Sequence, residues 1–248
     1  MYRRQLRLRH ILSCNQLIMH TSTTTIKPPM NQLQQNLDRY VDDDVFLRLL
    51  GEHEICVLSD FILNKAGINS FWQTYYGDTV PRVVICGINP GRHGAGKTGI
   101  PFVDFQSLSQ LISGIDRQDS ERSEEFFFQV VRQFGVESFF HSFYVTNVSS
   151  VGFIRDGKNL NYNELPEMAL KVVEQNFLQE MEIIQPTHVI SLGEVVQQTV
   201  SKLLPASVDC TMRLPHPAWV TTYRGKEMHE WTNRYLSMLD KFRQPQLA

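Results

Sequence analysis

Residues 83 to 105 read VVICGINPGRHGAGKTGIPFVDF. The first six, Val83 to Ile88, are mostly β-branched or apolar and are typical of a strand buried on both faces. The pattern ends abruptly at Asn89-Pro90-Gly91, where a glycine-rich loop begins. A buried strand that runs into a loop with exposed backbone forms the ligand crevice of open α/β proteins, at the carboxyl end of the sheet. The sequence therefore predicts the functional site at this loop.

Residues 91 to 98, GRHGAGKT, match the phosphate-binding pattern G-x-x-x-x-G-K-[ST], which would indicate a nucleotide triphosphatase. In that motif the lysine and threonine open a helix whose N-terminal amides hold the phosphates. Here Lys97-Thr98 is followed by Gly99-Ile100-Pro101, and a proline inside a helix costs about 3 kcal/mol. No later apolar strand ends in an aspartate that could hold a metal ion. The triphosphatase therefore stays an alternative that the surrounding sequence disfavours.

Three other stretches bear on this loop. Residues 126 to 148 read as a helix followed by a strand that ends in an asparagine, residues 157 to 166 read GKNLNYNELP, and residues 214 to 217 read LPHP after the last predicted strand. Together with GINPG and TGIPF of the first stretch, they resemble motifs of the uracil-DNA glycosylase superfamily in order and spacing, across about residues 80 to 240. The GKNLNYNELP stretch is similar to the single-strand-selective monofunctional branch.

The resemblance implies an enzyme that flips a damaged base out of DNA and hydrolyses its bond to deoxyribose, leaving an abasic site. It implies no metal, no cofactor and no lyase activity. It assigns Asn89 to the attacking water, and it assigns His216 to O2 of the departing uracil, where one such donor contributes about 3 to 4 kcal/mol. These two residues are the expected catalytic residues.

The same resemblance implies four substrate-binding residues. Asn147 is expected to pair with N3–H and O4 of uracil, which would reject cytosine because cytosine presents the opposite donor and acceptor. Phe102 is expected to stack on the base. Gly91 is expected to let the backbone approach the base closely, and Ile88 to line the pocket.

The chain departs from the family after the His-Pro pair. The family pattern continues Ser-Pro-Arg-Asn, which forms a wedge that enters the duplex, whereas residues 218 to 224 here read AWVTTYR. The Ile-Asn-Pro-Gly motif is also closer to the mismatch-specific branch. Uracil, 5-hydroxymethyluracil and another deaminated base all remain open as the preferred lesion. The expected DNA contacts are Lys97, Pro217, Trp219, Tyr223 and Arg224.

Composition limits the class of protein. With 248 residues, 42% of them hydrophobic, the chain can bury one substantial core. We expect a single domain over residues 31 to 248, and a monomer. A formal charge of −2 gives no global attraction to DNA, so any contact depends on local clusters of Arg and Lys. A non-catalytic nucleic-acid-binding protein of the same fold is the third hypothesis.

Residues 1 to 37 contain no acidic residue and carry four arginines. Such a composition is typical of a transit peptide, and equally of sequence read upstream of a later start at Met19 or Met30. We expect residues 1 to 30 to be a disordered extension. The four cysteines form no C-x-x-C pair, which argues against structural zinc and against a four-cysteine iron–sulfur cluster and favours a reducing compartment. The expected location is cytoplasmic, or nuclear or organellar in a eukaryote, and no run of apolar residues is long enough for a membrane span.

Periodicity predicts the remaining elements. Strands are expected at 83–88, 142–148, 188–192 and 210–214, and short helices within 33–50 and 56–68. The later helices are expected at 107–115, at 123–134 with Ser123 as N-cap, up to Ile184 from a cap at Asn161 or Asn163, at 194–204 and at 226–242. The segment between the second strand and the long helix is expected to be a loop. Alternating strands and helices predict an α/β fold, and the resemblance implies a three-layer α/β/α sandwich with a central four-stranded, mostly parallel sheet.

Overall fold

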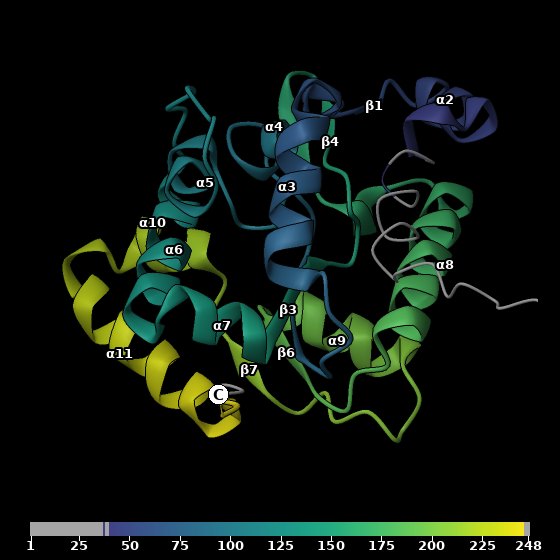
Figure 1. Cartoon of the computed structure of the whole chain (residues 1–248). Helices are drawn as coiled ribbons and strands as arrows, with labels where there is room; N and C mark the ends of the chain where they lie inside the picture. Colours follow the sequence, from purple (N-terminus) through teal and green to yellow (C-terminus); the bar gives the residue numbers. More distant parts are fainter. Residues whose placement is uncertain (1–36, 38–39, 246–248) are drawn as a thin grey trace, which may run out of the picture.

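A four-stranded parallel sheet forms the centre of the molecule (Figure 1). The computed structural model describes residue 37 and residues 40 to 245, so the predicted disorder of residues 1 to 30 lies outside it. The strand order is β3-β2-β6-β7, so β2 lies between β3 and β6 and pairs with both. The four strands are β2 (Val83–Gly87), β3 (Phe143–Asn147), β6 (Val189–Leu192) and β7 (Arg213–Leu214). The predicted fold class is confirmed.

Helices cover both faces of this sheet (Figure 1). One layer contains α6 (Arg122–Phe134), α7 (Val136–Ser142), α10 (Pro217–Tyr223) and α11 (Met228–Leu239). The other contains α8 (Glu167–Ile184) and α9 (Glu194–Leu203). The helix α6 buries most of its aromatic and valine side chains and ends at Gly135, which has φ of 94°. The remaining helices are α2 (Asp44–Gly51), η1 (Asp60–Asn64), α3 (Lys65–Tyr76), α4 (Ala95–Thr98), α5 (Phe105–Leu111), η2 (Tyr162–Glu164), η3 (Gly225–Glu227) and η4 (Asp240–Phe242).

A second, small antiparallel sheet lies in the segment that was predicted to be a loop. It consists of β1 (Cys56–Val57), β4 (Phe153–Arg155) and β5 (Lys158–Leu160). Asp156 and Gly157 connect β4 to β5 with φ of 52° and 69°. An Asp-Gly pair with positive φ at both residues is the most favoured two-residue hairpin turn. The turn signal was present in the sequence, and the prediction of a loop was wrong.

Three local predictions also differ from the structure. The predicted helix over 56–68 begins instead as a strand, because Cys56 and Val57 pair with β4. Asn161 caps the 3₁₀ helix η2 through a capping box with Glu164, while α8 starts after Pro166. The α6 helix begins at Arg122, with Glu121 at its N-cap rather than Ser123. Tertiary pairing and packing, which a local pattern does not contain, decide these boundaries.

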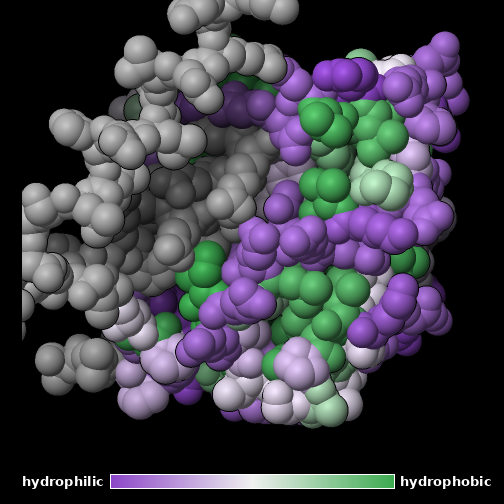
Figure 2. Space-filling model, turned by 90° about the vertical axis from the view of Figure 1, so that its right-hand side faces the viewer, coloured by the Kyte–Doolittle hydropathy of each residue, from purple (hydrophilic) through white to green (hydrophobic). Residues whose placement is uncertain are grey.

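On the face that Figure 2 shows, hydrophobic residues form two clusters that a band of hydrophilic residues separates. No helix in residues 40–245 is both long enough and apolar enough to cross a bilayer.

Candidate active site

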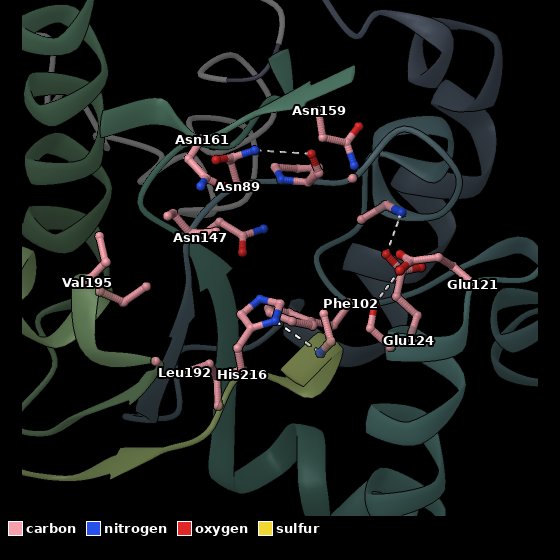
Figure 3. A pocket seen from close by; sticks show the side chains of 18 of the residues that line it. Asn89, Phe102, Glu121, Glu124, Asn147, Asn159, Asn161, Leu192, Val195 and His216 are labelled. Carbon is pink, nitrogen blue, oxygen red and sulfur yellow. Dashed lines mark hydrogen bonds between the residues drawn. The ribbon is translucent and has the colours of Figure 1, made fainter. Parts of the chain in front are cut away.

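A cavity of about 380 Å³ opens at the carboxyl ends of the parallel strands (Figure 3). All four strands contribute residues to it. Ile88 follows β2, Asn147 is the last residue of β3, Gly193 follows β6, and His216 lies two residues after β7. Because parallel strands end on the same edge of the sheet, segments far apart in the sequence meet there.

The cavity brings together the six predicted catalytic and substrate-binding residues. They are Ile88, Asn89, Gly91, Phe102, Asn147 and His216. Figure 3 shows Asn89, Asn147 and His216 on three sides of one space, with Phe102 beside His216. The five predicted DNA contacts do not line this cavity.

The His216 imidazole is held as a neutral hydrogen-bond donor. His216 is the N-cap of α10, and its Nδ1 accepts a hydrogen bond from the amide of Ala218 at 3.1 Å. A neutral imidazole that accepts at Nδ1 carries its hydrogen on Nε2. Burial lowers the pKa of His216 to about 4, because desolvation disfavours the charged ring. At neutral pH the Nε2–H group is therefore a donor without a positive charge.

Asn147 presents an unpaired amide to the cavity. The residue is 2% exposed, and its side-chain amide lines the cavity and forms no hydrogen bond with residues 40–245. Gly87, its partner on β2, makes room for it: a Cβ there would lie 2.3 Å from Asn147 Oδ1 and 2.5 Å from the Phe102 ring. An unpaired amide in a cavity is suited to a ligand that offers both a donor and an acceptor.

Phe102 forms an aromatic wall of the cavity from a strained backbone position. Its φ is 59°, a left-handed conformation that costs a non-glycine residue about 1 to 3 kcal/mol. The ring is buried, 4.9 Å from the ring of Phe127 and 5.7 Å from that of His216. The surrounding aromatic residues therefore fix the orientation of the ring.

The Asn89 side chain is oriented by the segment that joins β5 to η2. Its Oδ1 accepts a hydrogen bond from the amide of Tyr162 at 3.0 Å, and its Nδ2 donates to the carbonyl of Leu160 at 3.3 Å. The oxygen and the nitrogen of the amide are thus both held by backbone groups. Such a fixed amide is better suited to positioning a ligand than to transferring protons.

The small sheet holds that segment against the loop that follows β2. The amide of Arg92 donates to Asn159 Oδ1 at 3.3 Å, and its guanidinium donates to the carbonyl of Gly157. From the other side, the Leu58 side chain lies against both Gly96 and Gly152, so closely that a Cβ on either glycine would clash with it. The cavity wall thus depends on a segment, residues 56 to 58, that is remote in sequence.

Carboxyl groups that the sequence reasoning missed form the wall opposite Asn147 (Figure 3). Glu124 is 3% exposed; its Oε1 accepts a hydrogen bond from the amide of Ala95 at 2.7 Å, and its Oε2 has no partner among the described residues. Burial and, second, the charge of Glu121 raise the pKa of Glu124 well above its usual range, which favours the protonated form of this carboxyl. Only Gly94 allows this approach, because a Cβ there would lie 2.1 Å from Glu124 Oε2.

Other lining residues also went unpredicted. Asn159 and Asn161 belong to the GKNLNYNELP stretch, in which the sequence predicts no site residue and assigns Asn161 only a possible helix cap. Ser123 was noted only as a helix cap. Nothing in the sequence distinguishes the start of α9 or the glutamates of α6 as site residues. The full set of unpredicted lining residues is Pro90, Ala95, Glu121, Ser123, Glu124, Asn159, Asn161, Leu192, Gly193, Glu194, Val195, Val196 and Ala218.

Lys97 is engaged away from the cavity. Its ammonium contacts Asp119 at 2.7 Å, and α4, the helix that contains it, is a single turn that ends at Gly99 with φ of 75°. A phosphate site of the triphosphatase type needs a free lysine and a helix that continues, and neither is present. The structure therefore also disfavours the triphosphatase alternative. Pro217, another predicted DNA contact, is buried as the first residue of α10.

The three other predicted DNA contacts lie on or next to α10. Trp219 and Tyr223 are 38% and 70% exposed, and their rings are 6.2 Å apart. The Arg224 guanidinium lies 5.6 Å from the Trp219 ring and 3.3 Å from Glu227. Since His216 is the N-cap of α10, this group lies within a few turns of the cavity.

Comparison with known proteins agrees with this geometry. The family described as the Uracil DNA glycosylase superfamily matches residues 74–240. Among solved structures, that of wild-type SMUG2 from Pedobacter heparinus is similar, with a TM-score of 0.64 and 23% sequence identity over 76% of this chain and 88% of that one, which shows a shared fold. No curated protein sequence matches the chain. The family match covers two thirds of the chain and includes every lining residue of the cavity, and the chain therefore belongs to the uracil DNA glycosylase superfamily.

Proposed function

We propose that this chain excises uracil from DNA as a monofunctional glycosylase. Membership of the superfamily makes it a hydrolase of N-glycosyl bonds. The finer assignment, to uracil taken from a flipped nucleotide, is supported by the chemistry of the cavity. The reaction breaks the bond between N1 of the base and C1′ of the sugar, so negative charge develops on the base and positive charge on the sugar.

His216 would stabilise the departing base. A neutral Nε2–H donates to O2 of uracil as the charge on that oxygen grows, and it does not need to transfer a proton. The raised pKa of Glu124 favours the neutral carboxyl, which is compatible with this step because an ionised carboxylate in the same wall would repel the base anion.

Asn147 and Phe102 would recognise the base. The unpaired amide of Asn147 offers an acceptor to N3–H and a donor to O4 of uracil, the reverse of what cytosine requires. The Phe102 ring would stack on the base, which contributes about 1 to 3 kcal/mol in comparable sites.

Asn89 would position the water that attacks C1′. Its amide is fixed by the backbone of Leu160 and Tyr162, and an amide is too weak a base to deprotonate water. The positive charge on the sugar would then drive the attack. No lysine is present among the described residues that line the cavity, which supports excision without cleavage of the strand.

The observation that carries the proposal is the unpaired Asn147 amide in the same cavity as the neutral His216 donor. The test is incubation of the protein with an oligonucleotide that contains one uracil, in EDTA, followed by alkali to cleave abasic sites. We expect cleavage only after alkali, a loss of at least about 100-fold in rate for His216→Ala, and a comparable loss for Asn89→Ala. Exchange of Asn147 for aspartate should weaken uracil excision, since it removes the amide donor.

Three results would contradict the proposal. The first is no excision of uracil at any protein concentration while single-stranded DNA is still bound, which would favour a binding protein of the same fold. The second is hydrolysis of ATP with magnesium that is lost in Lys97→Ala. The third, a borohydride-trapped covalent complex with DNA, would show lyase chemistry and contradict only the monofunctional part.

A further inference from the structure

Two aromatic side chains on α10 are exposed to solvent, unlike the other aromatic side chains that the structure describes. Among residues 40–245, every Phe, Trp and Tyr is buried or half-buried except Trp219 and Tyr223. Leaving a large aromatic side chain in water forgoes about 1.5 to 3 kcal/mol of burial. Both exceptions lie within seven residues of His216, on one short helix.

These two rings belong to a continuous aromatic row. Trp219 lies 6.2 Å from Tyr223 on one side and 5.5 Å from Trp231 of α11 on the other. Two guanidinium groups accompany the row: Arg224 is 5.6 Å from the Trp219 ring, and Arg234 is 4.3 Å from the Trp231 ring. We call these five residues the α10–α11 aromatic row.

The row is a rigid surface rather than a mobile loop. The α10 helix packs against both α6 and α11, and buried Val220 and Thr221 anchor it on its inner side. Figure 1 shows α10 next to α6 and α11 at the edge of the molecule. Flat aromatic faces on a helix that is packed on its inner side suit stacking on an exposed base.

The start of the row is continuous with the cavity. His216 caps α10, Ala218 lines the cavity, and Trp219 is the next residue. When the flipped nucleotide of a DNA strand occupies the cavity, the rest of that DNA strand must leave the cavity past α10 or past the opposite rim. Aromatic faces accept any base, because every base has a π-face.

We propose that the α10–α11 aromatic row is a subsite for the nucleotide next to the flipped one, whose base stacks on Trp219 and Tyr223 in single-stranded DNA. The inference rests on the proposed uracil excision. It assigns these residues a role different from that of a wedge, since a stacked neighbour requires an unpaired base. Arg224 is partly neutralised by Glu227 at 3.3 Å, so stacking rather than phosphate binding supplies the contact.

The test replaces the neighbouring nucleotide by an abasic spacer. Single-stranded oligonucleotides with one uracil carry the spacer on the 5′ side, on the 3′ side or on neither, and kcat/KM is measured for each. For the wild-type protein, the spacer on one side should lower kcat/KM by about 5- to 150-fold, the value of one stacked base. On the oligonucleotide without spacer, kcat/KM of Tyr223→Ala should be lower than that of wild type by a similar factor. Adding the spacer should lower kcat/KM of this variant by less than a further twofold.

Further variants separate stacking from folding. Tyr223→Phe keeps the ring and should behave as wild type, whereas Trp219→Leu keeps contact with Trp231 and should lose the preference for a neighbouring base. Leu63→Ala, which removes a side chain that is 87% exposed on η1, is the matched control and should change nothing.

Two outcomes would overturn the inference. One is equal activity of wild-type protein on all three oligonucleotides. The other is a loss in Tyr223→Ala that appears with duplex substrates alone, as a wedge would give. In either case uracil is still excised, so failure here is distinct from failure of the proposed function, in which wild-type protein leaves uracil in place.

Discussion

Gly87 illustrates how single residues define the cavity. It carries no side chain, and two groups of the site occupy the space that a Cβ would take. The Glu124 carboxyl likewise occupies the space that a Cβ at position 94 would take. At this scale the chemistry depends on which residues are small as much as on which residues are polar.

Gly87→Ala should therefore lower the rate of catalysis strongly while the protein stays folded. The new methyl group would displace Asn147 and Phe102, and a misplacement of 1 Å at a catalytic site can cost about 100-fold in rate. We expect kcat/KM for uracil to fall by about 100-fold while the variant remains folded by circular dichroism. Gly51→Ala is the control, because nothing lies within 4 Å of a Cβ there. Unchanged kcat/KM in Gly87→Ala would mean that the two side chains are not held as described.

The pH profile should reveal the neutral state of His216. Its pKa in the folded protein is about 4, below the ordinary value of 6.5, so the imidazole stays uncharged down to about pH 5. The single-turnover rate should then show no transition due to His216 between pH 5.5 and 8. Because the unfolded chain binds the proton more strongly, this residue's contribution to folding should be lost as pH falls from about 6.5 to 4. A rate transition near pH 6.5 that disappears in His216→Gln would contradict this.

At the scale of elements, the strands place the site and the buried network behind them supports it. Asn147 ends β3, and its neighbour Thr146 donates a hydrogen bond to Glu180 of α8 at 2.6 Å. Tyr144 donates to the same Glu180 oxygen at 2.8 Å. The network joins the strand that carries the base-reading amide to the helix on the opposite face from α6.

Glu180→Gln should change how stability depends on pH. Burial raises the pKa of Glu180 from 4.5 to about 7, so the folded state binds more protons than the unfolded chain between these values. The free energy of unfolding should then fall as pH rises through that window, by about 3 kcal/mol in total. Urea unfolding at pH 5 and pH 8 should show that the free energy of unfolding of the variant, relative to wild type, is higher at pH 8 than at pH 5. Glu182→Gln, on an exposed position of the same helix, should show no such gain, and an equal gain in both variants would refute the assignment.

At the scale of the whole molecule, charge is nearly balanced. The chain has 24 Lys and Arg against 26 Asp and Glu, and the cationic side chains at the site are few and partly paired. Binding to DNA must then depend on the cavity and on stacking more than on the release of counterions.

The salt dependence of binding tests this balance. For single strands, the slope of log K against log salt is about −0.7 for each phosphate contact. With about two or three such contacts we expect a slope between about −1.4 and −2.1, measured by fluorescence anisotropy between 50 and 300 mM NaCl on the inactive His216→Ala protein. A slope steeper than about −4 would indicate an extended phosphate-binding surface instead.

The sequence by itself determined the α/β class, the strand at 83–88 and the identity of the residues at the strand ends. These follow from local causes: β-branched runs form buried strands, and Asn89, Asn147 and His216 lie in motifs directly after them. The positions of helices α6, α8, α9 and α11 follow in the same way, from apolar residues spaced three and four apart.

Only the tertiary structure decided which side chains share the cavity and in what state. Glu124 looks like an ordinary surface residue of a helix, and it becomes a buried wall of the cavity with a raised pKa because Gly94, thirty residues earlier, leaves room for it. Leu58 supports the cavity wall through glycines at 96 and 152. Such effects depend on the close approach of segments remote in the chain, and burial, hydrogen bonding and pKa are set by that approach rather than by residue type.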